Sequence, residues 1–113
     1  MKQNQLELDR EVLESIATLL RAFGDSTRLA LLQELRSGEK SVMELVELIG
    51  GSQSNISKQL RLLFEAGLTK REKRANQVFY NIGESELVET ICQGVCDKLN
   101  RDATSRRKQS FAI

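Results

Sequence analysis

A polar stretch between residues 52 and 61 holds the side chains best suited to recognition chemistry. It combines small hydroxyls, amides and cations, and its candidate binding residues are Ser52, Gln53, Ser54, Asn55, Ser57, Lys58 and Arg61. Amide side chains can pair with adenine edges, whereas lysine and arginine reach guanine or phosphate oxygens. The stretch therefore carries groups that could contact both the bases and the backbone of a nucleic acid. The alternative interpretation is an ordinary solvent-exposed helix face.

A second set of polar side chains follows, and its candidate binding residues are Arg71, Lys73, Arg74 and Gln77. Residues 52–74 contain six basic side chains and two acidic ones, although the net charge of the whole chain is only +1. Residues 101–113 contain four basic side chains and one acidic one. Positive charge concentrated in this way suits a polyanionic partner. Charge alone is explained equally well by ordinary solvated surface.

The chain has two thiols, Cys92 and Cys96, and no histidine. Four residues apart on a helix, the two thiols could bind a thiophilic metalloid such as arsenite, or react with oxidants or sulfane sulfur. Helical neighbours at this spacing have Cβ atoms about 5–6 Å apart, whereas a disulfide needs about 3.5–4.5 Å. The other interpretation is packing, because free cysteine is among the most buried residue types. Both interpretations stay open.

The elements that position these residues begin with two helices. Apolar spacing predicts the first over Leu6–Phe23. Asp25 can cap the second, whose predicted buried residues are Leu29, Leu31, Leu32 and Leu35.

Residues 41–66 have the pattern of a helix-turn-helix. A capping box at Ser41–Glu44 opens a short helix, Gly50 and Gly51 end it, and Ser52 caps a fourth helix that runs to about Ala66. The residues of this fourth helix predicted to face inward are Ile56, Leu60, Leu62 and Leu63. Those predicted to face outward are Ser54, Asn55, Lys58, Arg61 and Glu65. Exposed amides at its N-terminus suit phosphate oxygens. Together with the basic cluster that follows, this pattern predicts binding to double-stranded DNA.

Beyond Gly67 the pattern changes to strands. Leu68–Arg74 and Gln77–Ile82 are predicted to form a β-hairpin, and Glu84–Asn100 a final helix. The predicted fold is mainly α with a β-hairpin wing, a winged helix-turn-helix with four helices, two strands and a fifth helix. Residues 1–113 are expected to form one domain. Its ordered core is predicted at about 6–100, with a flexible tail at 101–113.

Several function classes are disfavoured by what the chain lacks. It has no apolar run near the roughly 20 residues of a membrane span, and residues 1–5 lack a signal-type apolar core. We therefore expect no membrane association and a cytoplasmic location, where the thiols stay reduced. The chain has no histidine, no glycine-rich phosphate loop and no nucleophile beside a base. Without these groups nothing in the sequence indicates catalysis, so we do not expect an enzyme.

Three ordered motifs resemble those of the ArsR/SmtB repressors. The segment FGDSTRLALL at 23–32 is similar to that family's LADPTRLRIL. The segments SQSNISKQLRLL at 52–63 and EAGL at 65–68 are similar to SQSTVSHHLKLLREAGL, and QVFY at 77–80 to the wing pattern xVYY. The resemblance implies a homodimer built on the first and last helices. Such a dimer would bind a palindromic operator and repress transcription until an inducer releases it.

The departures from the family pattern concern the operator and the inducer. Phe64 stands where a charged residue is usual, and Lys58-Gln59 replaces a frequent histidine pair. The metal box ELCVCDL aligns with Glu39–Leu45, where Ser41 and Met43 replace both cysteines. Without histidine, the zinc site of other members cannot form either, so we expect no zinc or nickel sensing.

What remains as an inducer site is the thiol pair. The alternatives are a winged-helix regulator without thiol sensing and a winged-helix module that binds only proteins.

Overall fold

The two N-terminal helices each begin after an aspartate. The computed structural model describes residues 8–106, with helix α1 at Arg10–Ala22 and helix α2 at Ser26–Leu35. The Asp9 carboxylate accepts the Val12 amide at 3.0 Å, and the Asp25 carboxylate accepts the Arg28 amide at 3.1 Å. The apolar spacing predicts that α1 begins at residue 6. That start is wrong, because Asp9 caps α1 and the helix begins at residue 10.

Helices α3 (Val42–Ile49) and α4 (Gln53–Glu65) form the predicted helix-turn-helix. The capping box is present, with the Glu44 amide donating to Ser41 Oγ at 3.1 Å and the Ser41 amide donating to Glu44 Oε1 at 2.8 Å. The chain turns between the helices at two glycines with φ of 92° and 89°. Only glycine adopts such angles at little cost, so these residues set the angle at which α4 leaves α3.

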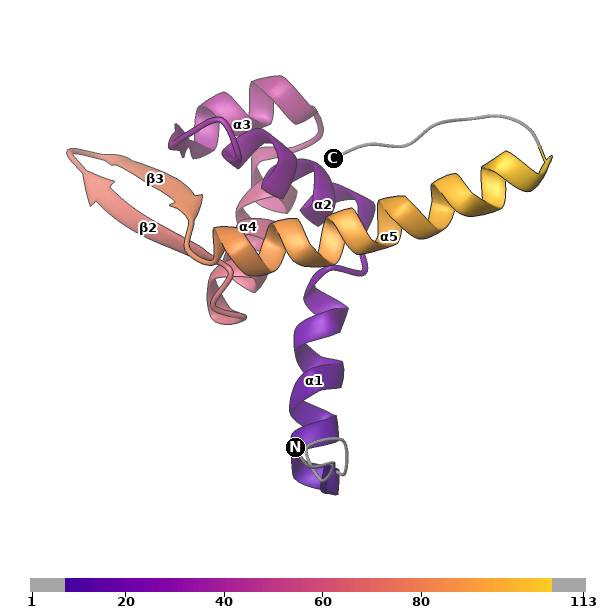
Figure 1. The fold of residues 1–113 in the computed structure, drawn as a ribbon. Helices are drawn as coiled ribbons and strands as arrows, with labels where there is room; N and C mark the ends of the chain where they lie inside the picture. Colours follow the sequence, from indigo (N-terminus) through magenta and orange to yellow (C-terminus); the bar gives the residue numbers. More distant parts are fainter. Residues whose placement is uncertain (1–7, 107–113) are drawn as a thin grey trace.

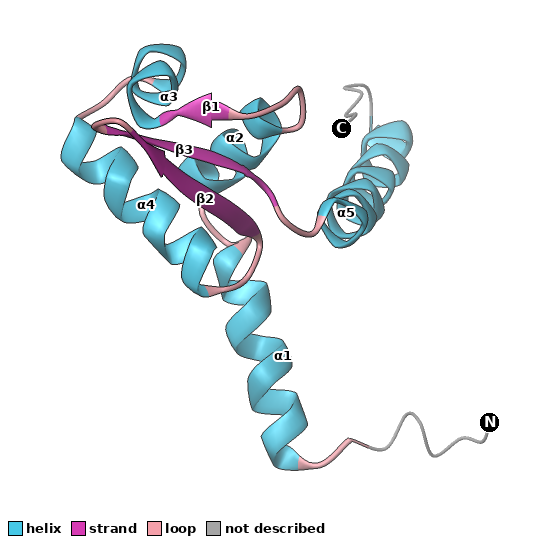
Figure 2. Ribbon diagram, turned by 90° about the vertical axis from the view of Figure 1, so that its left-hand side faces the viewer, coloured by secondary structure: helices cyan, strands magenta, loops and turns pink. Residues whose placement is uncertain are grey.

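The wing is a three-stranded antiparallel sheet in the order β1-β3-β2. Strands β2 (Thr69–Arg74) and β3 (Gln77–Ile82) confirm the predicted hairpin. Strand β1 (Lys40–Ser41) was not predicted, because two residues are too short for a periodic signal. It pairs with β3 through Lys40 opposite Tyr80 and Ser41 opposite Phe79. Figure 2 shows this sheet beside α4, with β1 joining it to the start of α3.

Helix α5 runs over Ser85–Arg106. Its predicted end at Asn100 is wrong, because the helix continues through residues 101–106. An ion pair between Lys98 and Asp102, at 2.8 Å, links successive turns across that point. Residues 107–113, and residues 1–7 at the other end, lie outside the described part of the chain.

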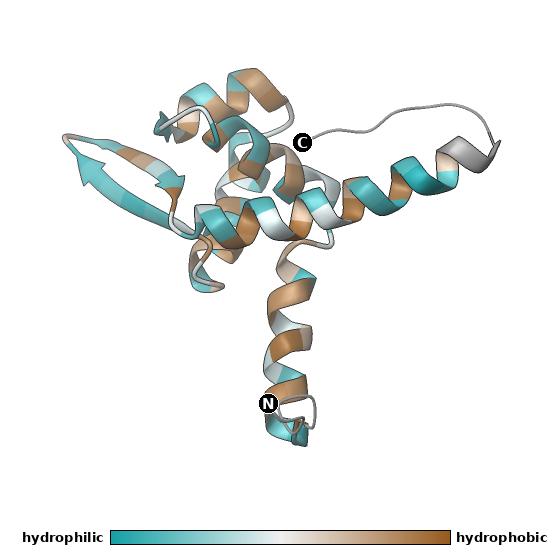
Figure 3. Cartoon of the chain, in the orientation of Figure 1, coloured by the Kyte–Doolittle hydropathy of each residue, from teal (hydrophilic) through white to brown (hydrophobic). Residues whose placement is uncertain are grey.

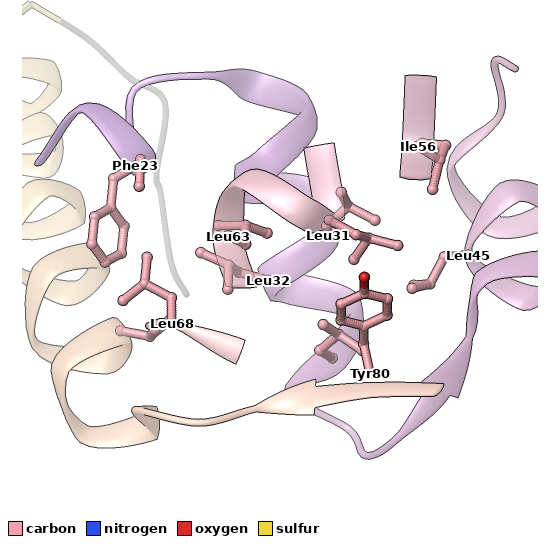
Figure 4. Packing of buried hydrophobic residues seen from close by; sticks show 12 residues of the cluster. Phe23, Leu31, Leu32, Leu45, Ile56, Leu63, Leu68 and Tyr80 are labelled. Carbon is pink, nitrogen blue, oxygen red and sulfur yellow. The ribbon is translucent and has the colours of Figure 1, made fainter. Parts of the chain in front are cut away.

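The hydrophobic core lies between α2, α3, α4, β3 and the start of α5 (Figure 4). Its fully buried side chains are Leu31, Leu32, Leu45, Ile56, Leu60, Leu63, Leu68 and Val88, joined by Tyr80. Two predicted core residues are wrong: Leu29 is 40% exposed and Leu62 is 36% exposed. Neither belongs to the buried cluster, and Leu29 instead lines an open apolar groove between α2 and α5.

Two helices project from this body in different directions. Figure 1 shows α1 and the second half of α5 extending away from the helix-turn-helix and the wing. Among the described residues of these helices, Leu19 and Ala22 of α1 and the first two turns of α5 pack on the core. Figure 3 shows apolar residues along the length of α1. Within residues 8–106, no helix combines the length and apolar character that crossing a bilayer requires.

Candidate nucleic-acid interface

The outward face of α4 carries the predicted polar stripe. Ser54, Asn55, Lys58, Arg61 and Glu65 are all exposed, as is Gln53 at the helix start. The Ser52 hydroxyl accepts the Asn55 amide at 3.1 Å, so its oxygen caps α4. The first turn of α4 is solvent-exposed and contains no acidic residue. It therefore offers polar side chains and a positive helix end to an anion.

A groove separates α4 from the wing. It has a volume of about 510 Å³ and is lined by Val42, Ser57, Arg61, Arg71, Lys73, Val78 and Tyr80. Arg71 and Lys73 alternate with residues on the other face of β2, and they share their face with the buried Thr69. Three cations and a hydroxyl thus meet in one concave surface, a geometry suited to phosphate oxygens.

The aromatic side chain of Phe64 holds one of these cations. The Arg71 guanidinium lies over the Phe64 ring, 3.9 Å from its centre. A phenyl ring attracts a cation without satisfying its N–H donors, so these donors stay available for another partner. Phe64, a departure from the family pattern, therefore has a local role in placing Arg71 at the groove.

Arg74 lies on the other face of the hairpin. Its guanidinium donates to Glu39 at 2.8 and 3.2 Å and to Glu72 at 3.2 Å, and lies 4.0 Å from the centre of the Phe79 ring. The hydrogen bond from Arg74 lowers the pKa of the Glu39 carboxyl. The structure therefore does not bring Arg74 together with Arg71 and Lys73. Gln77, which pairs with Arg74 across the hairpin, is exposed.

A chain of hydrogen bonds behind α4 involves two residues outside the predicted binding set, Arg28 and Gln59. The Arg28 guanidinium donates to Gln59 Oε1 at 2.7 Å, and Gln59 Nε2 donates to Asn55 Oδ1 at 3.2 Å. Arg28 also donates to the carbonyls of Ala22 and Arg21 at 2.9 and 3.0 Å. The spacing of Asn55 and Gln59, four apart on one helix, could have indicated their contact. Nothing local indicates that Arg28 reaches Gln59.

The two thiols belong to a different concavity from the groove between α4 and the wing. Cys92 and Cys96 are half-buried in an apolar groove of about 310 Å³ between α2 and α5, which Leu29, Val95 and Leu99 also line. Burial raises the pKa of the Cys92 thiol, the nearby Cys96 adds to the rise, and Arg36 opposes it. Within the described part of the chain, no three metal-ligating side chains of the His, Cys, Asp or Glu type gather at one place.

Comparison with known proteins assigns the family. The family model described as "Bacterial regulatory protein, arsR family" matches residues 25–70. The HTH-type transcriptional regulator NmtR of Mycobacterium tuberculosis is 30% identical over 88 residues, which cover 78% of this chain and 73% of that protein.

Solved structures agree with this assignment. The transcriptional repressor BigR of Xylella fastidiosa is 30% identical, with a TM-score of 0.63 over 90% of this chain and all of that one. The homodimeric winged helix-turn-helix domain Mb0332 of Mycobacterium bovis is 19% identical, with a TM-score of 0.73 over 90% of this chain and 96% of that one, and supports the fold alone. These findings confirm the predicted family, fold class and non-enzymatic character. The chain belongs to the arsR family of bacterial regulatory proteins, which are DNA-binding transcription regulators.

Proposed function

We propose that this protein is a repressor that binds a palindromic operator as a homodimer. The observation that carries the proposal is the joint surface of α4 and the wing. An exposed polar stripe on α4 lies beside a groove lined by Arg61, Arg71 and Lys73. In this arrangement α4 enters the major groove, and the cations of the wing contact the phosphate backbone.

Dimerisation is supported by apolar surface outside the core. Val12, Leu13, Ile16 and Leu20 form a continuous exposed stripe on α1, and Val95 and Leu99 are exposed on α5. An exposed apolar surface on two projecting helices favours self-association. A two-fold dimer would then present two α4 helices to two half-sites of a palindrome.

The test of this proposal is binding to fragments of the gene's own promoter over a range of salt concentrations. Lys58→Ala and Arg61→Ala each remove a cation from the outward face of α4. Removing a cation that neutralises phosphate weakens binding to all sequences and lowers the salt slope by about one, whereas removing a side chain that reads a base relaxes one base position by about 1–3 kcal/mol. Lys98→Ala on α5, which removes the same charge, is the control. Unchanged affinity in both α4 variants would overturn the assignment of α4 as the reading helix.

We further propose that the inducer is a thiophilic species that acts on Cys92 and Cys96. The two thiols share one apolar groove with Val95 and Leu99, the exposed residues of α5 that support the dimer. Arsenite would bind both sulfurs with release of two waters. A ligand that distorts α5 would change the spacing of the two α4 helices, and this differential cost between free and DNA-bound dimers is what induction requires.

Operator release by arsenite and by polysulfide, in the wild type and in a Cys92→Ser/Cys96→Ser variant, tests this step. We expect release from the wild type alone. If both proteins respond alike, or if neither responds, the thiols are packing residues of a regulator without thiol sensing. If the wild type binds no DNA at all, the alternative of a protein-interaction module gains support.

A further inference from the structure

We propose that Gln59 fixes the orientation of the Asn55 amide, so that Asn55 presents N–H donors to the operator and selects acceptor-rich base edges. This inference rests on the proposed function of α4 as the reading helix. It goes further in naming which groups one reading residue offers and which residues determine that choice.

The orientation starts at Arg28, whose guanidinium has donors and no acceptor. Two of its nitrogens are held by the last carbonyls of α1, Nε by Ala22 at 2.9 Å and Nη2 by Arg21 at 3.0 Å. Its third nitrogen, Nη1, lies 2.7 Å from the Gln59 side chain. Because a donor must meet an acceptor, the Gln59 amide has to turn its oxygen toward Arg28.

The same logic passes along Gln59 to Asn55. With Oε1 turned toward Arg28, the NH₂ group of Gln59 points along α4 toward residue 55, where it lies 3.2 Å from Oδ1. Gln59 is half-buried, whereas Asn55 is exposed. If the Asn55 amide were turned around, two NH₂ groups would face each other. The Asn55 oxygen is therefore directed toward Gln59, one turn further along α4, and its NH₂ group is left for another partner.

A base edge meets this NH₂ group as a pair of donors. In the major groove guanine offers two acceptors, N7 and O6, whereas the usual asparagine contact to adenine needs the amide oxygen to accept from N6. Because that oxygen is turned toward Gln59 and the NH₂ group is the part left for the operator, we expect Asn55 to prefer guanine over adenine and cytosine. Discrimination by a well-formed contact of this kind is about fivefold or more in affinity.

Gln59→Glu tests the inference because it should reverse the orientation. A carboxylate accepts at both oxygens, one from Arg28 and one from Asn55. The Asn55 amide then has to turn its NH₂ group toward residue 59 and its oxygen outward. The preference at that base position should move from guanine to bases with exposed donors, cytosine or adenine. Gln59→Met, which can make neither hydrogen bond, should flatten the preference.

The measurement is competition binding to operator variants that carry each of the four base pairs at every half-site position. A new negative charge lowers the affinity for all four base pairs alike. The ratios of affinity among the four base pairs at one position are therefore unaffected by this general loss. Asn55→Ala identifies the position that Asn55 reads, and Asn55→Ala/Gln59→Glu should show no preference there. Circular dichroism establishes folding, and if Gln59→Glu does not fold, Gln59→Met carries the test.

A moved preference in Gln59→Glu, or a flattened one in Gln59→Met, supports the inference. A wild-type preference retained in the folded variants overturns it, as does an Asn55→Ala variant that reads every position like the wild type. If the wild type does not distinguish its operator from unrelated DNA, the proposed function itself fails and the inference falls with it.

Discussion

Among the individual residues, Arg71, Lys73 and Arg74 differ in role because of the pleat of β2. Arg71 and Lys73 face the groove beside α4, whereas Arg74 turns to the other side and meets Glu39 and Glu72. The clustering of these cations and the alternation of the strand are visible in the sequence. The partner of Arg74 is not, because Glu39 lies 35 residues away.

This division predicts different salt behaviour for two variants. Lys73→Ala should weaken operator binding and lower the salt slope by about one for each phosphate that is no longer neutralised. Arg74→Ala should weaken binding with an unchanged slope, because Arg74 positions the wing through Glu39 rather than neutralising phosphate. Salt titrations of both variants check this. Glu39→Gln should resemble Arg74→Ala, and a lowered slope in Arg74→Ala would make Arg74 a direct contact.

The environment of Cys92 predicts how this thiol reacts. Its pKa is raised, first by burial and then by the neighbouring Cys96. Because the thiolate is the reactive form, alkylation of Cys92 in a Cys96→Ser variant should have its midpoint at a higher pH than in the same chain unfolded. The sign for stability follows: the contribution of this thiol is present below the unfolded-state pKa and is lost as the pH rises through the folded-state pKa.

Rates of iodoacetamide modification between neutral and alkaline pH, with and without denaturant, measure both midpoints. A folded-state midpoint at or below the unfolded one would contradict the burial of this thiol.

At the scale of elements, the caps and stops were predictable because each depends on residues within one turn. Asp25, Ser41 and Ser52 begin their helices where the sequence indicates, and Gly67, with φ of 78°, ends α4. Strand β1 and the last turns of α5 were missed. The first exists only through its pairing with β3, and the second extends beyond the last apolar residue of its stripe.

The tip of the wing contains one strained residue. Ala75 has φ of 57°, the left-handed region in which a Cβ costs roughly 1–2 kcal/mol. Ala75→Gly should relieve this strain, less the extra chain entropy that glycine loses on folding. We expect a net gain of up to about 1 kcal/mol in the free energy of unfolding, measured with urea. Ala103→Gly, inside α5, is the matched control and should lose about 1 kcal/mol. A loss in both variants would show that Ala75 is unstrained.

At the scale of the whole molecule, the apolar stripe of α1 links the fold of one chain to its assembly. The sequence shows the stripe but not its exposure. The periodicity of Leu13, Ile16 and Leu20 is equally typical of a helix packed on its own core. The structure separates the two cases, because these side chains are 41–49% exposed while the core closes without them.

Ile16→Lys should therefore dissociate the dimer and leave the fold intact. Ile16 is 41% exposed, so burying the rest of its side chain in the interface contributes about 1 kcal/mol, and a lysine in its place adds the cost of an unpaired charge. A two-fold dimer contains two copies of the substitution, so we expect the dissociation constant to rise by about two orders of magnitude or more. Sedimentation velocity at micromolar concentration measures this shift. Operator affinity should fall with it, because a monomer reads one half-site.

Thr18→Lys, on the opposite side of α1 and also exposed to solvent, is the control. It should sediment as the wild type does, since that side adjoins the end of α4 rather than the apolar stripe. A dimeric Ile16→Lys variant with wild-type operator affinity would remove α1 from the interface and leave the exposed residues of α5 as its remaining candidate. A variant that loses its helical circular dichroism signal would instead show that α1 stabilises the single chain, contrary to the exposure of its stripe.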